Sequence, residues 1–191
     1  MTVTRTSAGV LHPRLRGRAR CVFVALSAAG LAALAWAPFV SPLPRLIYNP
    51  SDSVAVGWYW VDPRVPSMFA LHRGSLVVVP LPSAAAALAA WRGYLPLGIP
   101  LLKPVAAVAP QRVCVTHDRV RIDGVPVATA LRTDSRGRPL HAWRECRRLH
   151  PGELFLLSTS NPASFDSRYF GPVRASAVLG IAHPVWLEAR R

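Results

Sequence analysis

The sequence predicts a mostly β domain built of antiparallel sheets, placed behind one N-terminal transmembrane helix. Two observations carry this prediction. Residues 21–40 form an apolar run without a single charge, and this run directly follows an arginine-rich segment. Beyond it, short runs of β-branched and aromatic residues alternate with turns rich in Pro and Gly. That alternation is typical of short strands joined by hairpins and loops.

The overall composition agrees with one modest domain and a membrane segment. The chain has 191 residues, which is long enough for a real hydrophobic core. Hydrophobic residues make up 51% and charged residues only 17%, and the mean hydropathy of +0.26 is high for a soluble domain. Neither Cys-x-x-Cys nor His-x-x-His spacing occurs, so we expect no metal site and no cofactor.

The apolar run divides the chain into three parts. Residues 1–20 contain five arginines and no acidic residue, and they are predicted to be a basic cytoplasmic tail. Twenty helical residues span roughly 30 Å, so residues 21–40 match the hydrocarbon thickness of a bilayer. Because basic flanks stay in the cytoplasm, residues 41–191 are expected in the periplasm, tethered to the lipid of the inner membrane.

A cleaved signal sequence is the alternative for residues 21–40. Ala35-Trp36-Ala37 offers a cleavage site of the A-x-A type. Cleavage there would leave Pro38 as the first mature residue, where an imino acid fits poorly. An uncleaved anchor is therefore the favoured interpretation.

The net charge of +14 raises nucleic acid as a partner. The charge is scattered, however, and its densest cluster lies directly before the apolar run, at Arg14, Arg16, Arg18 and Arg20. Such a cluster is typical of membrane orientation. Since no helix-turn-helix, zinc-finger or RNA-binding motif is present, no nucleic-acid binding is expected.

The elements of the domain are predicted in order from local patterns. Ser83 is the expected N-cap of a short alanine-rich helix over 84–91. The Asp123-Gly124 pair between two alternating runs is a strong hairpin pattern. Residues 101–103 fit a strand if Pro104 lies at an edge or a bulge. Further strands are expected over 58–61, 75–80, 112–115, 120–127, 153–158 and 177–182.

Cysteine usage fits an export topology. Cys114 and Cys146 both lie in the part placed outside the cytoplasm, where disulfides persist, so we expect a bridge between them. Closing that loop contributes roughly 3–4 kcal/mol on the loop-entropy view. The alternative is two buried free thiols. Cys21, at the membrane edge, is interpreted as a lone small hydrophobe.

One lysine stands out in a chain that otherwise uses arginine. Lys103 is the only lysine beside 22 arginines, and it lies in the apolar run Leu101-Leu102-Lys103-Pro104-Val105. A desolvated lysine can lose its proton near neutral pH, whereas arginine cannot. Ser53 lies in a turn before the aromatic run Trp58-Tyr59-Trp60. A serine with a neutral lysine is an established alternative to the Ser-His-Asp nucleophile.

Three segments together resemble one family. They are residues 49–59 (Asn-Pro-Ser-Asp-Ser-Val-Ala-Val-Gly-Trp-Tyr), residues 101–107 (Leu-Leu-Lys-Pro-Val-Ala-Ala) and residues 164–172 (Ser-Phe-Asp-Ser-Arg-Tyr-Phe-Gly-Pro). In this order and spacing they resemble the nucleophile, lysine and D-S-R-Y-[FW]-G boxes of the TraF conjugative transfer peptidases, relatives of the type I signal peptidases. The resemblance implies a signal-peptidase-like antiparallel β domain.

The resemblance also implies roles for individual residues. Ser53 is then the nucleophile and Lys103 the general base, while the Ser53 N–H and the Ser51 hydroxyl hold the oxyanion. Ser164 matches a residue that hydrogen-bonds the lysine. Asp166 and Arg168 form an ion pair that supports the site, with Asp166 the nearer of the two to catalysis. A purely structural role for that pair remains the alternative.

The implied activity is the processing of a conjugative pilin precursor, either by cleavage alone or by cleavage and cyclisation, with a conjugative secretion complex as a further partner. Two departures from the family pattern are present: the first affects the rate more than the reaction, and the second alters a loop without touching the nucleophile or the base. Ala55 stands where the family has Pro, and residues 108–111 replace a Pro-Gly-Asp-like turn. The competing interpretations are a general type I signal peptidase and a non-catalytic pilus-assembly scaffold.

Overall fold

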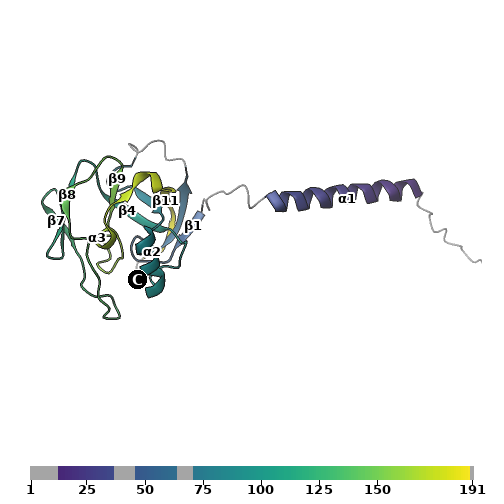
Figure 1. The fold of residues 1–191 in the computed structure, drawn as a ribbon. Coiled ribbons are helices and arrows are strands. Elements are labelled where there is room, and N and C mark those ends of the chain that lie inside the picture. The colour runs from purple at the N-terminus through teal and green to yellow at the C-terminus, as the bar shows by residue number, and fades with distance from the viewer. Residues whose placement is uncertain (1–12, 37–45, 64–70, 190–191) are drawn as a thin grey trace, which may run out of the picture. The chain divides into compact units, whose positions relative to one another are not determined.

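A computed structural model describes residues 13–36, 46–63 and 71–189 (Figure 1). The chain divides into two compact units, residues 1–42 and residues 43–191. The first unit contains helix α1, Pro13–Trp36, which begins eight positions before the predicted apolar run. Residues 1–12 of the predicted tail and 37–40 of the predicted anchor lie outside the described residues.

Among the described residues, no helix has both the length and the hydropathy that crossing a membrane requires. The transmembrane anchor therefore stays a prediction.

The second unit is built on a large antiparallel sheet. Its seven strands follow the order β1-β2-β11-β3-β4-β9-β10, so the second strand of the unit, β2, is the neighbour of its last described strand, β11. The bounds are β1 Leu46–Asn49, β2 Gly57–Asp62, β3 Leu76–Val79, β4 Leu101–Val108, β9 Glu153–Leu156, β10 Val173–Arg174 and β11 Gly180–Leu187.

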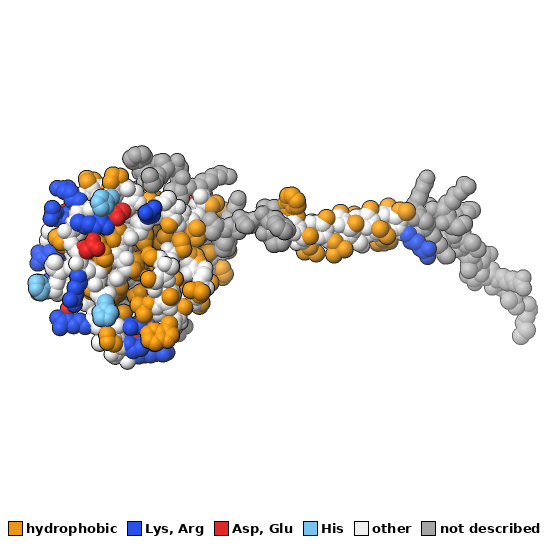
Figure 2. All heavy atoms as spheres, in the orientation of Figure 1, with side chains coloured by type: hydrophobic (Ala, Val, Ile, Leu, Met, Phe, Trp, Pro, Cys, Tyr) orange, Lys and Arg blue, Asp and Glu red, His pale blue; other side chains and the backbone are white. Residues whose placement is uncertain are grey.

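A second antiparallel sheet has four strands in the order β7-β6-β5-β8. Its strands are β5 Arg112–Thr116, β6 Arg119–Ile122, β7 Val125–Thr129 and β8 Cys146–Arg148. The predicted hairpin is confirmed, because Asp123 and Gly124 connect β6 to β7 with φ of 50° and 84°. In Figure 2, arginine side chains gather over the part of the domain that carries β7 and β8.

Helices are few in this unit. Helix α2, Ser83–Arg92, follows β3, and the one-turn helix α3, Ser167–Phe170, follows β9. A 3₁₀ turn covers Ala175–Ala177. The predicted N-cap was wrong by one residue: Pro82 occupies that position without a side-chain bond, and Ser83 is the first helical residue.

Three hydrophobic clusters hold the sheets together. One packs around Val79, Val105 and Leu156 of the large sheet, and another around Tyr59 and Val61 of β2. The third joins the two sheets, because Phe155 and Leu157 of the large sheet pack with buried valines of β5 and β6. The small sheet is thus fixed to the large one through the segment that follows β9.

Strand β4 lies in the interior of the large sheet and carries Lys103. It lies between β3 and β9, so Pro104 is not at an edge. Pro104 pairs regularly with Leu76, and the register shift of the strand lies further on, between Val105 and Ala107, so the prediction that Pro104 lies at an edge or a bulge was wrong. Pro104 still accepts a hydrogen bond at its carbonyl from the N–H of Leu157. An interior strand thus holds the only lysine of the chain.

Candidate active site

The predicted nucleophile lies in a turn between β1 and β2 that is organised by one amide side chain. Asn49 ends β1 and is buried. Its Nδ2 donates to the carbonyls of Ser51 and Ala55 at 2.8 and 3.1 Å, and its Oδ1 accepts from the N–H and the hydroxyl of Ser51. Since this side chain satisfies several backbone groups of the turn, it fixes the loop that carries Ser53.

Ser53 is held by its backbone carbonyl, while its N–H has no hydrogen-bond partner among the described residues. Its carbonyl accepts a 2.6 Å hydrogen bond from the hydroxyl of Ser158, which follows β9. Within the described part of the chain, the Ser53 N–H donates no hydrogen bond. Only 7% of the residue is exposed. A fixed serine with an unbonded N–H matches what a nucleophile beside an oxyanion site needs.

Lys103 is buried in the middle of β4, where only 3% of the residue is exposed. It lies opposite Val77 of β3. Burial penalises the ammonium and lowers the pKa of Lys103 to about 8, with a smaller raising effect from Asp166 and a smaller lowering effect from Arg168. At pH 7, about one protein molecule in ten then carries an uncharged Lys103, which is enough for a working base.

The hydroxyl of Ser164 joins the two predicted catalytic side chains. Lys103 Nζ donates to Ser164 Oγ at 2.7 Å, and Ser164 Oγ lies 3.3 Å from Ser53 Oγ. The resemblance implies that Lys103 is the base for Ser53, and a direct hydrogen bond between them was therefore expected. The described residues show no such bond. Ser164 contacts the lysine as predicted, and it also contacts the nucleophile.

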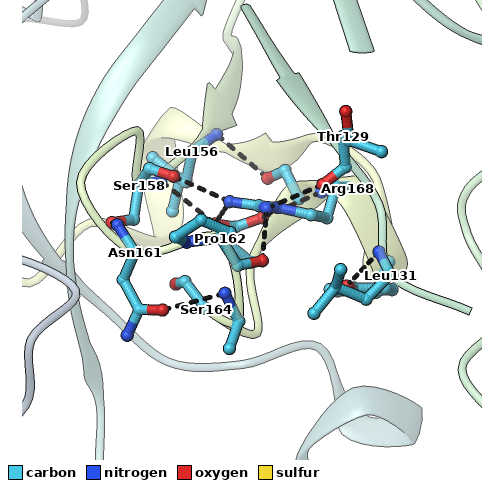
Figure 3. A network of polar contacts seen from close by, with 12 residues as sticks. Thr129, Leu131, Leu156, Ser158, Asn161, Pro162, Ser164 and Arg168 are labelled. Atoms are coloured by element: carbon cyan, nitrogen blue, oxygen red, sulfur yellow. Dashed lines mark hydrogen bonds and ion pairs between the residues drawn. The ribbon is translucent and has the colours of Figure 1, made fainter. Parts of the chain in front are cut away.

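Asp166 and Arg168 form the predicted ion pair, and both are fully buried. The guanidinium binds the carboxylate side-on at 2.8 and 2.9 Å and also donates to the carbonyls of Thr129, Ser158 and Pro162 (Figure 3). The carboxylate further accepts from the N–H of Ser158. The pair therefore braces the loop that presents Ser164 and Ser158.

No hydrogen bond links the Asp166 carboxylate to Lys103 or Ser53 in the described part of the chain. Its contacts are those of a positioning residue, and a catalytic role for it stays a prediction. The Ser51 hydroxyl donates to Asn49 at 2.9 Å, so it must rotate away from the amide before it can bind an oxyanion.

A cavity of about 290 Å³ opens onto these groups. Ser53, Lys103 and Ser164 belong to its polar lining, together with Ser51, Asp134, Ser135 and Asn161. Its walls are mainly apolar and aromatic, formed by Tyr94, Leu95, Leu101, Leu131, Leu140, Phe165 and Tyr169. A larger cavity of about 570 Å³ shares Asn161 with it but lacks Ser53, Lys103 and Ser164. The smaller cavity is therefore the better candidate for a substrate side chain next to the reacting bond.

Sequence reasoning missed two residues of this site. The sequence patterns give neither residue a role: Asn49 appears only in the motif segment 49–59, and Ser158 ends the expected strand 153–158. Both are buried polar residues at or just beyond the end of a strand, and buried polar groups must find hydrogen-bond partners. That requirement is the pattern that could have identified them.

The structure joins Cys114 of β5 to Cys146 of β8 in a disulfide, as predicted. The bridge links neighbouring strands of the small sheet, away from the cavity lining. Cys21 of α1 is a free thiol and is exposed within its own unit.

Comparison with protein families gives one match over most of the chain. Residues 18–187 match the family described as signal peptidase, peptidase S26. This range includes Ser53, Lys103, Ser164 and the Asp166–Arg168 pair.

Individual relatives point to conjugation. A conjugal transfer protein TraF of Agrobacterium fabrum is 40% identical over 151 residues, covering 74% of this chain and 81% of the relative. A plasmid transfer protein TraF of Escherichia coli is 31% identical over 147 residues, covering 72% and 80%. A solved signal peptidase I from Enterococcus faecalis V583 is 21% identical with a TM-score of 0.34, covering 58% of this chain and 94% of that chain.

Proposed function

The chain belongs to the signal peptidase family, peptidase S26, and from this membership we propose that it is a serine endopeptidase with a Ser53/Lys103 dyad. The observation that supports the dyad is the hydrogen-bonded series Lys103–Ser164–Ser53 on the wall of an apolar cavity. A buried lysine of lowered pKa next to a buried serine is the pairing that this chemistry needs.

In the proposed first step, Ser53 Oγ attacks the carbonyl carbon of the scissile peptide bond. Its proton passes to the Ser164 oxygen while the Ser164 proton passes to the uncharged amine of Lys103. The oxyanion is stabilised by the unbonded N–H of Ser53 and by the Ser51 hydroxyl once that group leaves Asn49. Lysine then returns its proton to the leaving amine, and an acyl-enzyme remains.

The second step decides the product. Water, deprotonated by Lys103, hydrolyses the ester and restores Ser53. Alternatively, an amine of the substrate attacks the ester and forms a new peptide bond, which is favoured where water is excluded and the amine is held close. The first outcome is cleavage and the second is cyclisation.

The proposed substrate is the precursor of a conjugative pilin, processed at the periplasmic face of the inner membrane. The relatives named as conjugal or plasmid transfer proteins support this assignment. The predicted anchor at 21–40 would hold the enzyme beside membrane-inserted precursors, next to the conjugative secretion complex.

Mass spectrometry of the mature pilin tests the proposal. A strain with the wild-type gene should yield a shortened or circular pilin, and strains with Ser53→Ala or Lys103→Arg should accumulate the precursor, because arginine cannot act as a base. Ser176→Ala, at an exposed serine outside the linings of both the candidate cavity and the larger cavity, is the matched control and should process normally.

The rival interpretations give different results. Normal pilin processing in both the Ser53 and the Lys103 variants would leave a scaffold role standing. Accumulation of many unprocessed exported proteins in a strain without the gene would indicate a general signal peptidase.

A further inference from the structure

A second cavity, of about 340 Å³, adjoins the candidate active site. The two cavities share Leu140, Phe165 and Tyr169 in their linings. The rest of the second cavity is formed mainly by apolar residues of α2 and by the side chains of Arg92, His141 and Phe170. The two cavities are therefore neighbours, with these three side chains common to both linings.

Arg92 gives this apolar cavity an unusual feature. Its side chain is only 10% exposed. Its Nη1 donates to the Tyr94 hydroxyl at 3.3 Å and lies 3.9 Å from Asp134 Oδ2. Its Nε is buried without a hydrogen-bond partner. Among the described residues no hydrogen bond is found for Nη2 either, but Nη2 is not a buried atom and stays accessible.

The unpaired atoms of Arg92 share one edge of the guanidinium. Nε and Nη2 carry parallel N–H groups along the edge that binds carboxylates side-on, and Arg168 uses this same edge for Asp166. A buried donor without an acceptor is unfavourable unless a ligand supplies one. The geometry therefore favours an acceptor with two oxygens.

The nearby carboxylate does not meet this need. Asp134 accepts from Arg138 Nε at 2.7 Å, from the N–H groups of Arg136 and Arg138, and from the Tyr94 hydroxyl. One carboxylate thus serves two arginines, Arg92 and Arg138, which leaves a positive charge in excess. Among the described residues that line the second cavity, none is acidic.

We propose that the second cavity is a substrate subsite that takes an apolar stretch of the peptide and pairs its carboxylate with the Nε–Nη2 edge of Arg92. The subsite rests on the proposed peptidase function, since its occupant is the same chain that Ser53 cleaves. The carboxylate comes either from an Asp or Glu side chain or from a free C-terminus of the substrate. In both cases the arginine selects a charge at a fixed distance from the scissile bond.

Cleavage of paired peptides tests the subsite. The full-length protein is incubated with internally quenched peptide libraries in which alanines are fixed before the cleavage site. In each pair of peptides, one position on either side of the site is Glu or Gln. Each peptide is made with a C-terminal acid and with a C-terminal amide. The Glu/Gln pairs identify a side-chain source, and the acid/amide pairs identify a terminal source. We expect kcat/KM for one acidic form to exceed that of its neutral partner by tenfold or more, as for hydrogen bonds to charged groups.

Two variants locate the effect. Arg92→Gln should remove the preference, while Arg136→Gln, which removes the same charge from an exposed site in the neighbouring loop, should keep it. Equal cleavage of acidic and neutral peptides by the wild type would overturn the subsite and leave the peptidase assignment intact. A preference that persists in Arg92→Gln would overturn it as well.

Absence of cleavage in all peptides would instead speak against the peptidase, and a binding measurement then decides on the subsite. N-acetyl-leucine and its amide serve as probes in ligand-observed saturation-transfer NMR with the full-length protein. Binding of the acid but not the amide, lost in Arg92→Gln and kept in Arg136→Gln, supports the subsite. Equal binding of both probes, binding of neither, or acid binding unchanged in Arg92→Gln overturns it.

Discussion

The amine of Lys103 and the hydroxyl of Ser53 are linked through the hydroxyl of Ser164, which lies 2.7 Å from the nitrogen and 3.3 Å from the Ser53 oxygen. A proton that leaves Ser53 for the lysine therefore has an intermediate group in its path. This arrangement makes Ser164 more than a support for the base, and it leads to the first prediction.

Ser164→Ala should lower kcat by about 10²–10⁴-fold, the range typical of a lost proton-transfer group, while KM changes little. The fold should survive, because the change removes a single hydroxyl. Ser164→Thr keeps a hydroxyl at the same carbon and should retain much more activity than the alanine variant. A loss below tenfold in Ser164→Ala, measured by steady-state cleavage of a precursor peptide, would show that Lys103 reaches Ser53 directly.

Activity should increase with pH through the pKa of Lys103. Burial lowers this pKa to about 8, so the uncharged base is the minor form below pH 8 and the major form above it. The profile of kcat/KM against pH should rise with unit slope and level off above about pH 8. An enzyme whose rate is flat between pH 6 and 9 would not be using this lysine as its base.

Asn49→Ala should damage the site more than its size suggests. The variant removes the Asn49 donor from the partly buried carbonyls of Ser51 and Ala55, of which Ala55 keeps the Tyr59 hydroxyl, so we expect a loss of roughly 1 kcal/mol in the free energy of unfolding. We also expect kcat to fall, because Ser53 lies in that turn. Asn49→Asp keeps the acceptor for Ser51 and loses the two donors, so it separates the two halves of the network. Chemical denaturation and peptide cleavage measure the two effects, and wild-type kcat in Asn49→Ala would contradict the positioning role.

The Asp166–Arg168 pair should behave as a unit. Arg168→Met leaves a buried carboxylate uncompensated and should destabilise the domain by about 3–5 kcal/mol. The double variant Asp166→Leu/Arg168→Met removes both charges and should be less destabilised than the sum of the two single changes. Equilibrium unfolding of the three variants checks this coupling. Additive losses would show that the two side chains act independently.

The local patterns of the sequence predicted most of the large sheet because its strands follow hydrophobic runs. The Asp123-Gly124 hairpin followed from turn chemistry that needs no tertiary context. Strand β1 at 46–49 and the two-residue strand β10 were not predicted, since so few residues form no pattern of their own. Their strand geometry comes from pairing with β2 and β9.

In the candidate site, too, some features follow from the sequence and others depend on tertiary contacts. The lone lysine and the serine-containing turn suggested Lys103 and Ser53, and the resemblance of three motif segments to a known family implied the roles of Ser164 and the Asp166–Arg168 pair. The position of Ser164 between base and nucleophile depends on how the loop before α3 meets β4, and such tertiary geometry has no local sequence pattern. The roles of Asn49 and Ser158 were missed for the same reason, because each acts on backbone groups that only the folded chain brings near.

Because β2 and β11 are neighbours in the large sheet, the strand that follows the Ser53 turn depends on a partner that is made late in synthesis. The turn with Ser53 enters directly into β2, and β2 finds one of its two partners in the stretch 180–187 near the other end of the chain. A growing polypeptide that has already made its serine and its lysine still lacks that partner. In the proposed peptidase, cleavage activity would therefore appear only after residues 180–187 have been made and have paired with β2.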